Sequence, residues 1–83
     1  MDTRRVAFIT GAAGGLGSSM VRRLAADGFQ VIAADIDADS VAQAVDQVDG
    51  ARAIVLDVSD VDAVREAIDR AADGCELAVL VNN

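Results

Sequence analysis

The chain has 83 residues, which is enough for one small domain, and 53% of them are hydrophobic, so it can bury a core. Its net charge is -7 and the acidic residues are spread along the sequence, which argues against a nucleic-acid partner and against an anionic membrane surface. No apolar run is long enough to cross a bilayer and the N-terminus shows no signal-peptide pattern, so we expect a cytoplasmic protein.

Several residue types that often carry catalysis are absent. The chain has no His, no Tyr and no Lys, so most side chains that act as general bases near neutral pH are missing. The single cysteine, Cys75, has no His to activate it and no partner for an internal disulfide. The lack of His also argues against a zinc site. Asp and Glu remain as candidate acids and bases, but most of them fall at helix ends or on polar faces, and we predict no metal site.

Short apolar runs alternate with stretches of helical spacing along the whole chain. The runs predict four strands: Arg5 to Thr10, Gln30 to Ala34 with Asp35 at its end, Ala51 to Leu56, and Leu77 to Val81. The stretches between them predict three helices: from Gly15 or Gly17 to Asp27, from about Asp39 to Val48, and from a cap at Ser59 to the residues before Gly74. A glycine follows each helix, at Gly28, Gly50 and Gly74.

Capping signals and apolar stripes support the second and third helices. Asp37 or Asp39 can cap the second helix. The segment from Ser59 to Asp62 has the form of a capping box with Ser59 as the N-cap. Four residues predict the buried stripe of the third helix: Val61, Val64, Ile68 and Ala71.

This alternation of strands and helices predicts a Rossmann-type α/β domain with a doubly wound parallel sheet. Right-handed crossovers give the strand order 3-2-1-4, with a topological switch between the first and fourth strands. Ligands bind beside such a switch, at the carboxyl ends of the strands. The residues that fall there are glycine or polar: Gly11 to Gly17, Asp35, Asp57, and Asn82 with Asn83.

The glycine-rich turn from Thr10 to Gly17 joins the first strand to the first helix. Unpaired N–H groups and the positive end of the helix dipole make a helix N-terminus attractive to phosphate, provided that side chains leave room. We expect Gly11 to allow the tight turn, Gly15 to let the backbone approach a pyrophosphate, and Gly17 to let the helix lie close to the strand. A merely flexible loop is the weaker interpretation, because a strand and a helix flank the turn.

The acids after the second and third strands are the next candidates. Asp35 can accept hydrogen bonds from the hydroxyls of an adenosine ribose and would repel a 2′-phosphate, which favours NAD over NADP. Asp57 could accept a hydrogen bond from the adenine amino group, or could belong to the approach to the third helix. Asn82 and Asn83 could tie neighbouring strands together or line the cofactor cleft; spacing alone does not decide between these roles.

Three of these motifs resemble those of the short-chain dehydrogenase/reductase family. Residues Thr10 to Gly17 match its TGxxxGxG fingerprint, Asp57-Val58 looks like its adenine-contacting pair, and Leu80-Val81-Asn82-Asn83 looks like the start of its Asn-Asn-Ala-Gly motif. The resemblance implies that residues 1–83 form the N-terminal part of a dinucleotide-binding domain. It implies an NAD-dependent oxidoreductase that interconverts an alcohol and a ketone by hydride transfer.

The resemblance also implies positions for the cofactor. The pyrophosphate would lie against residues of the glycine-rich turn: Gly11, Ala13, Gly14, Gly15, Leu16 and Gly17. The ribose and adenine would contact Asp35 and Ile36, the adenine ring Asp57 and Val58, and the nicotinamide half Asn83. NADP-preferring members often carry a basic residue where this chain has Gly14, which agrees with NAD.

The family's catalytic Ser, Tyr and Lys lie beyond the fourth strand, so the resemblance assigns no catalytic residue here. We therefore expect a fragment, a truncated product or a partial view of a longer dehydrogenase, inactive by itself and homo-oligomeric when complete. A non-catalytic NAD-binding module, such as a redox sensor or regulatory subunit, is the alternative. A methyltransferase using S-adenosylmethionine fits less well, since Thr10 stands where an acid is usual, and a P-loop nucleotidase would need a Lys.

Overall fold

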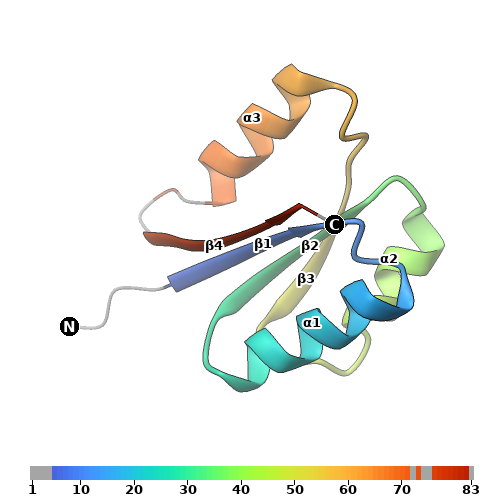
Figure 1. Ribbon diagram of the computed structural model, residues 1–83, viewed down its shortest axis with the longest axis vertical. Coiled ribbons are helices and arrows are strands. Elements are labelled where there is room, and N and C mark those ends of the chain that lie inside the picture. Colours follow the sequence, from blue (N-terminus) through green and yellow to red (C-terminus); the bar gives the residue numbers. More distant parts are fainter. Residues whose placement is uncertain (1–4, 72, 74–75, 83) are drawn as a thin grey trace.

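The computed structural model describes residues 5–71, 73 and 76–82. Strands and helices alternate through them, as the sequence predicts (Figure 1). The strands are β1 (Arg5–Thr10), β2 (Gln30–Asp35), β3 (Ala51–Val55) and β4 (Glu76–Asn82). The helices are α1 (Gly15–Ala26), α2 (Ala38–Val45) and α3 (Val61–Ala71). Within the described residues, no helix has the length and apolar character that a membrane span requires.

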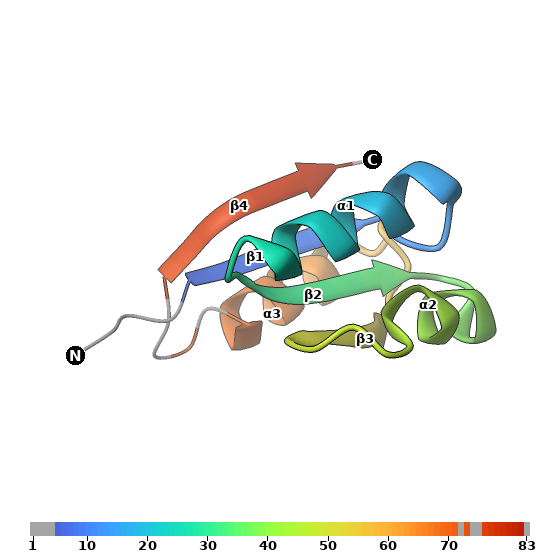
Figure 2. The ribbon, with the colours of Figure 1, turned by 90° about the horizontal axis from the view of Figure 1, so that it is seen from below.

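All four strands are parallel and lie in the order β3-β2-β1-β4, which confirms the predicted doubly wound sheet (Figure 2). The register brings the carboxyl ends of neighbouring strands level. Thr10 of β1 is opposite Ala34 of β2 on one side and Asn82 of β4 on the other, and Asp35 is opposite Val55 of β3. The loops that follow these strands therefore meet at one edge of the sheet, beside the switch between β1 and β4.

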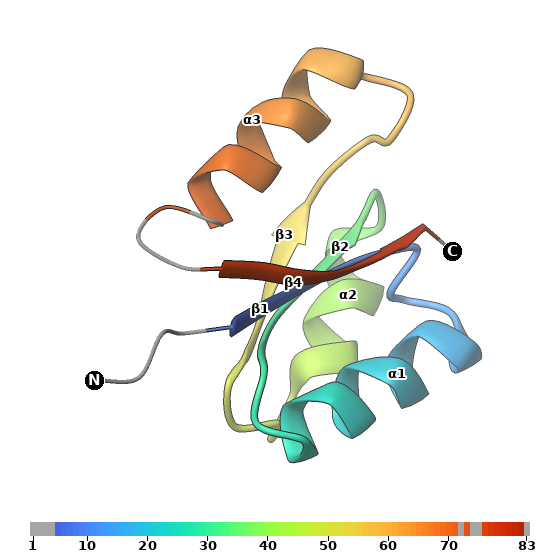
Figure 3. The ribbon, with the colours of Figure 1, turned by 60° about the vertical axis from the view of Figure 1, so that its left-hand side comes forward.

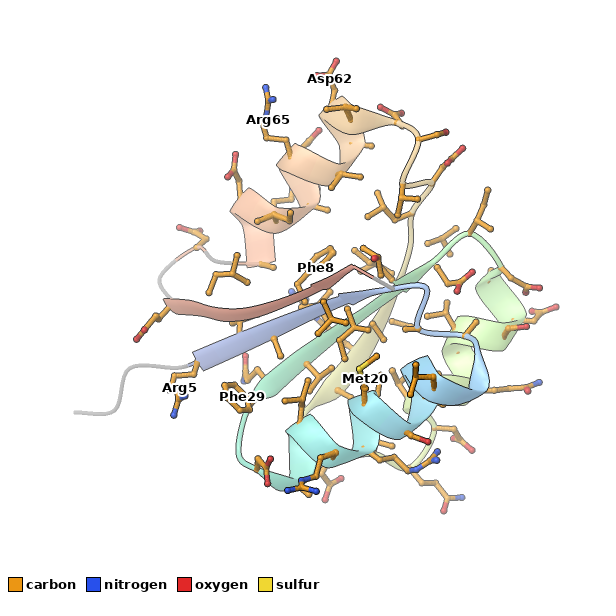
Figure 4. All side chains as sticks on the ribbon, viewed as in Figure 1. Arg5, Phe8, Met20, Phe29, Asp62 and Arg65 are labelled. Atoms are coloured by element: carbon orange, nitrogen blue, oxygen red, sulfur yellow. The ribbon has the colours of Figure 1, made fainter. Side chains whose placement is uncertain are left out.

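Helices cover both faces of the sheet, with α1 and α2 on one side and α3 on the other (Figure 3). Side chains alternate along each strand, so Ala7 and Ile9 of β1 pack with Val21 of α1 and Val41 of α2. Val6 and Phe8 point to the opposite face, where α3 lies. Figure 4 shows Phe8 on that side and Met20 directed from α1 toward the sheet. This double cover explains why the four residues of β1 from Val6 to Ile9 are all apolar.

The C-terminus of α1 follows the sequence prediction. Gly28 has a φ of +96°, a conformation that glycine adopts without strain. Its N–H donates to the Ala25 carbonyl at 3.1 Å, and the Phe29 N–H donates to the Leu24 carbonyl at 3.1 Å. This pair of hydrogen bonds ends α1 as a Schellman motif and directs the chain into β2.

The second helix ends at Val45, three residues before the predicted end at Val48. Asp46 leaves the helical conformation and Gln47 has a φ of +60°, so the helix cannot continue. The Val48 N–H then donates to the Val45 carbonyl in a turn, and Val48 still packs against the core. The spacing of these valines thus reflects burial rather than one continuous helix. At the other end, Asp37 caps the helix by accepting the Ser40 N–H at 3.1 Å.

The predicted cap of α3 was wrong by one residue. The N-cap is Asp60, whose Oδ1 accepts the Ala63 N–H at 3.1 Å, while Ser59 donates to Asp57 instead. Val61, in the first turn of α3, is 64% exposed and is not among the residues packed against the core, so its place in the predicted buried stripe was wrong. Val64 and Ile68 do pack against the core, as predicted.

The cap of α3 gives a first prediction. Asp60→Ala should lower the free energy of unfolding by about 1 kcal/mol, because the Ala63 N–H loses its partner at the helix N-terminus. Urea denaturation of the protein measures this change. Ser59→Ala is the matched comparison, and a larger loss for Ser59→Ala than for Asp60→Ala would contradict the assignment of the cap.

Candidate functional site

The glycine-rich turn, residues 11–17, leads from β1 into α1. Gly11 has a φ of +64°, which confirms the predicted tight turn. A Cβ added at Gly17 would lie 2.5 Å from the Gly11 carbonyl oxygen and 2.7 Å from Ala12 Cα, so only glycine lets α1 pack this closely. At Gly15, in contrast, a Cβ would meet nothing within 4 Å, so the packing of the protein itself does not require a glycine there.

Among the described residues, no side chain caps the N-terminus of α1. Gly14 is its N-cap, and no acid lies in its first turn. The hydrogen-bonded ladder starts where the Ser18 N–H donates to the Gly14 carbonyl at 2.8 Å. An N-terminus of this kind keeps its partial positive charge available for an anion from outside the helix.

Asp35, at the end of β2, contacts the glycine-rich turn directly. Its Oδ2 accepts the Ala13 N–H at 3.0 Å, and its Oδ1 accepts the Asp37 N–H at 3.2 Å. These bonds, with that of Asp37 the stronger influence, hold the pKa of Asp35 below its ordinary value of 3.8. The Ala13 amide, predicted to face a pyrophosphate, thus already donates within the protein.

Asp57, just after β3, is oriented by Ser59. One oxygen, Oδ1, accepts both the Ser59 hydroxyl at 2.7 Å and the Ser59 N–H at 2.9 Å. The hydroxyl is the main cause, and the N–H the second, of a pKa below the ordinary 3.8. With both bonds on Oδ1, Oδ2 is left with the capacity to accept a hydrogen bond from a ligand. No pattern in the sequence indicates that Ser59 orients Asp57.

A cavity of about 150 Å³ lies between the ends of β1, β2 and β3. It is lined by Gly11, Asp35, Ile36, Leu56, Asp57 and Val58. The structure therefore brings together five of the predicted cofactor contacts and adds Leu56, a buried residue at the strand end that the sequence reasoning missed.

Three large apolar side chains near this edge are exposed instead of joining the core. Leu16 in the first turn of α1 is 68% exposed, Ile36 after β2 is 66% exposed, and Val58 after β3 is 55% exposed. All three are predicted cofactor contacts. Exposed apolar side chains beside a cavity with polar groups are typical of a ligand site.

The other predicted positions are less completely placed. Asn82 pairs through its backbone position with Thr10, and the Thr10 hydroxyl donates to the Val81 carbonyl at 3.2 Å, which joins the ends of β1 and β4. Asn83 lies outside the described residues. Among the residues that are described, no group of His, Cys, Asp and Glu could hold a metal ion.

A parallel sheet with an uncapped helix N-terminus after β1 and a carboxylate after β2 is the arrangement of a Rossmann-type dinucleotide-binding domain. The family model for short chain dehydrogenase matches residues 5–83. The chain belongs to this family.

Known relatives and solved structures agree with this assignment. The chain is 43% identical over 83 residues to galactitol 2-dehydrogenase of Agrobacterium fabrum, covering 95% of this chain and 32% of the relative. A short chain dehydrogenase/reductase from Burkholderia phymatum in complex with NAD matches with a TM-score of 0.83 and 28% identity, over 94% of this chain and 30% of that one. An actinorhodin polyketide ketoreductase solved with NADPH matches with a TM-score of 0.85 and 25% identity, over 96% and 33% of the two chains. The chain thus spans about a third of the length of these proteins.

The two glycines of α1 give a second prediction. Gly17→Ala should lower the free energy of unfolding by about 1–3 kcal/mol, because its Cβ would overlap the backbone of the turn. Gly15→Ala, two residues earlier and with open space around its added Cβ, should leave stability unchanged or raise it by about 0.5 kcal/mol. Thermal unfolding of the two variants checks both values, and equal stability of the two would contradict the packing role of Gly17.

The orientation of Asp57 gives a third prediction. Ser59→Ala removes the hydroxyl donor, so the pKa of Asp57 should rise toward 3.8. Because the pKa of Asp57 in the folded protein is below the ordinary one, its hydrogen bonds stabilise the fold fully above about pH 4. This stabilisation is lost as the pH falls through the pKa of the folded state. Carboxyl 13C titration of wild type and Ser59→Ala by NMR measures the pKa of Asp57. An unchanged pKa in Ser59→Ala would refute the orienting role of the hydroxyl.

Proposed function

We propose that this chain is the cofactor-binding part of an NAD-dependent oxidoreductase that interconverts an alcohol and a ketone by hydride transfer. The observation that carries the proposal is that the uncapped N-terminus of α1 and the cavity lined by Gly11, Asp35 and Asp57 both lie at the carboxyl edge of one parallel sheet. Membership of the short-chain dehydrogenase family supports it, as do the dehydrogenase names of the relatives.

The cofactor would extend along this edge. Its pyrophosphate would lie on the turn, near Gly14, Gly15, Leu16 and Gly17, where the N-terminus of α1 offers partial positive charge. The ribose hydroxyls would donate to the lone pairs of the Asp35 carboxylate that the Ala13 and Asp37 N–H groups leave unused. The adenine would fill the cavity between Ile36 and Val58 and donate its amino hydrogen to Asp57. Asn83 would contact the nicotinamide half.

The preference for NAD is part of the proposal, because solved relatives include complexes with NAD and with NADPH. The low pKa of Asp35 keeps it charged at neutral pH, and a carboxylate repels a 2′-phosphate. Gly14 also supplies no cation for that phosphate.

When bound, NAD would supply the acceptor for a hydride from the alcohol carbon and, in its reduced form, the donor of a hydride to the ketone. The chain holds no Tyr or Lys, and we assign the proton transfer that accompanies the hydride to none of its residues. Three expectations stay predictions: a small-molecule alcohol or ketone as the substrate, a homo-oligomeric assembly and a cytoplasmic location.

Cofactor titration tests the proposal. NADH should bind the protein more tightly than NADPH. Gly15→Ala should weaken the binding of NADH by about tenfold, because the added Cβ enters the space proposed for the pyrophosphate. The change in fluorescence of NADH or NADPH on binding measures the two affinities. Gln43→Ala, at an exposed position of α2, is the control.

Each outcome has a consequence. If wild-type protein binds neither cofactor, or if Gly15→Ala binds NADH as well as wild type does, the proposed site is wrong. If NADPH binds more tightly, the NAD preference is wrong. If the protein made from its complete natural reading frame binds NADH but turns over no alcohol or ketone, the non-catalytic module is the better description.

A further inference from the structure

The glycine-rich turn is joined to the end of β2 by two successive hydrogen bonds. The Ala12 N–H donates to the Ala34 carbonyl at 3.1 Å, a backbone bond that any sequence could make. The Ala13 N–H donates to Asp35 Oδ2 at 3.0 Å, across 22 residues of sequence, and this bond depends on the carboxylate side chain.

Asp35 is itself fixed on the β2 side. Its second oxygen accepts the Asp37 N–H at 3.2 Å, and its own carbonyl accepts the Leu56 N–H from the end of β3 at 2.9 Å. The carboxylate therefore bridges the turn that follows β1 and the segment that follows β2. Each N–H is held by a separate oxygen, and a charged acceptor makes such bonds stronger than neutral ones.

We propose that Asp35 is a positioning residue for the phosphate-binding turn, acting through the Ala13 N–H, in addition to its place beside the ribose. This rests on the proposed cofactor site. A carboxylate offers about four lone-pair positions, and two are used by Ala13 and Asp37, so a ribose can bind without displacing either amide. One side chain thus couples the sugar position to the conformation of the turn that receives the pyrophosphate.

The positioning role and a purely electrostatic role predict opposite results for Asp35→Asn. Removing a negative charge near a phosphate strengthens phosphate binding if charge alone matters. An Asn has one acceptor oxygen and no charge, so it cannot hold both N–H groups, and a bond that it keeps to Ala13 is weaker than the bond to a carboxylate. The turn is then held less firmly, and phosphate binding weakens if Asp35 positions it. The informative ligand is nicotinamide mononucleotide, which carries a phosphate but no adenosine ribose.

The first measurement needs no ligand. Amide hydrogen exchange of Ala13 in the protein made from its complete natural reading frame should be about tenfold faster in Asp35→Asn than in wild type. The Ala12 amide should stay as it was, because its partner is a backbone carbonyl. Asp39→Asn, which removes the same charge from the exposed first turn of α2, is the matched control and should leave Ala13 unchanged.

The second measurement is a titration with nicotinamide mononucleotide into the millimolar range, followed through the amide NMR signals of residues 14–17. Asp35→Asn should weaken binding severalfold relative to wild type and Asp39→Asn. Equal Ala13 exchange in all three proteins, or equal or tighter nicotinamide mononucleotide binding by Asp35→Asn, would overturn the positioning role. If wild type binds no NADH while Ala13 exchange still depends on Asp35, the cofactor site fails and the anchoring of the turn stands.

Discussion

The close approach of α1 to the turn at Gly17 is the constraint on which the site depends. The backbone of Gly11 and Ala12 lies where a side chain at position 17 would be, so the helix can lie against the end of β1 only because no side chain is present. This contact sets the direction of α1 and places its N-terminus at the carboxyl edge of the sheet. Its effect differs from that of Gly15, whose surroundings are open. The two glycines of the fingerprint therefore have different surroundings. Packing within the protein requires a glycine at position 17, whereas the space around Gly15 is open.

The carboxylates at the end of β2 and just after β3 both have low pKa values and both accept a backbone N–H group close in sequence. At Asp57 the Ser59 hydroxyl lowers the pKa most, and at Asp35 the Asp37 N–H does so, followed by the Ala13 N–H. Asp35 binds the N–H of Asp37, and Asp57 that of Ser59, in each case two residues on. The repeated geometry follows from the fold, since each strand ends at the same edge and each chain must then turn toward a helix. Charge thus accumulates at the edge where the uncapped, partly positive end of α1 also lies.

Most of the fold could be predicted because its signals are local. Apolar runs predict the four strands, and Gly28 predicts the end of α1. The errors also have local causes: Ser59 and Asp60 are both good N-caps, and the neighbouring Asp57 occupies the serine hydroxyl. The bond between Ala13 and Asp35 could not be predicted, because it depends on the register that sets Thr10 opposite Ala34. Spacing along the chain carries no information about such a register.

The central position of β1 has a consequence for folding kinetics. Its pairing with β2 closes a short loop, whereas the Thr10 hydroxyl reaches the Val81 carbonyl across 71 residues of sequence. The loop closed by pairing β1 with β4 is about three times longer than the one closed by pairing β1 with β2, and closing it costs about 1 kcal/mol more in chain entropy. Because its residues are the farthest apart in sequence, this pairing also contributes most to the contact order. During synthesis the segment from β1 to β3 can therefore assemble first, with one side of β1 open until β4 has left the ribosome.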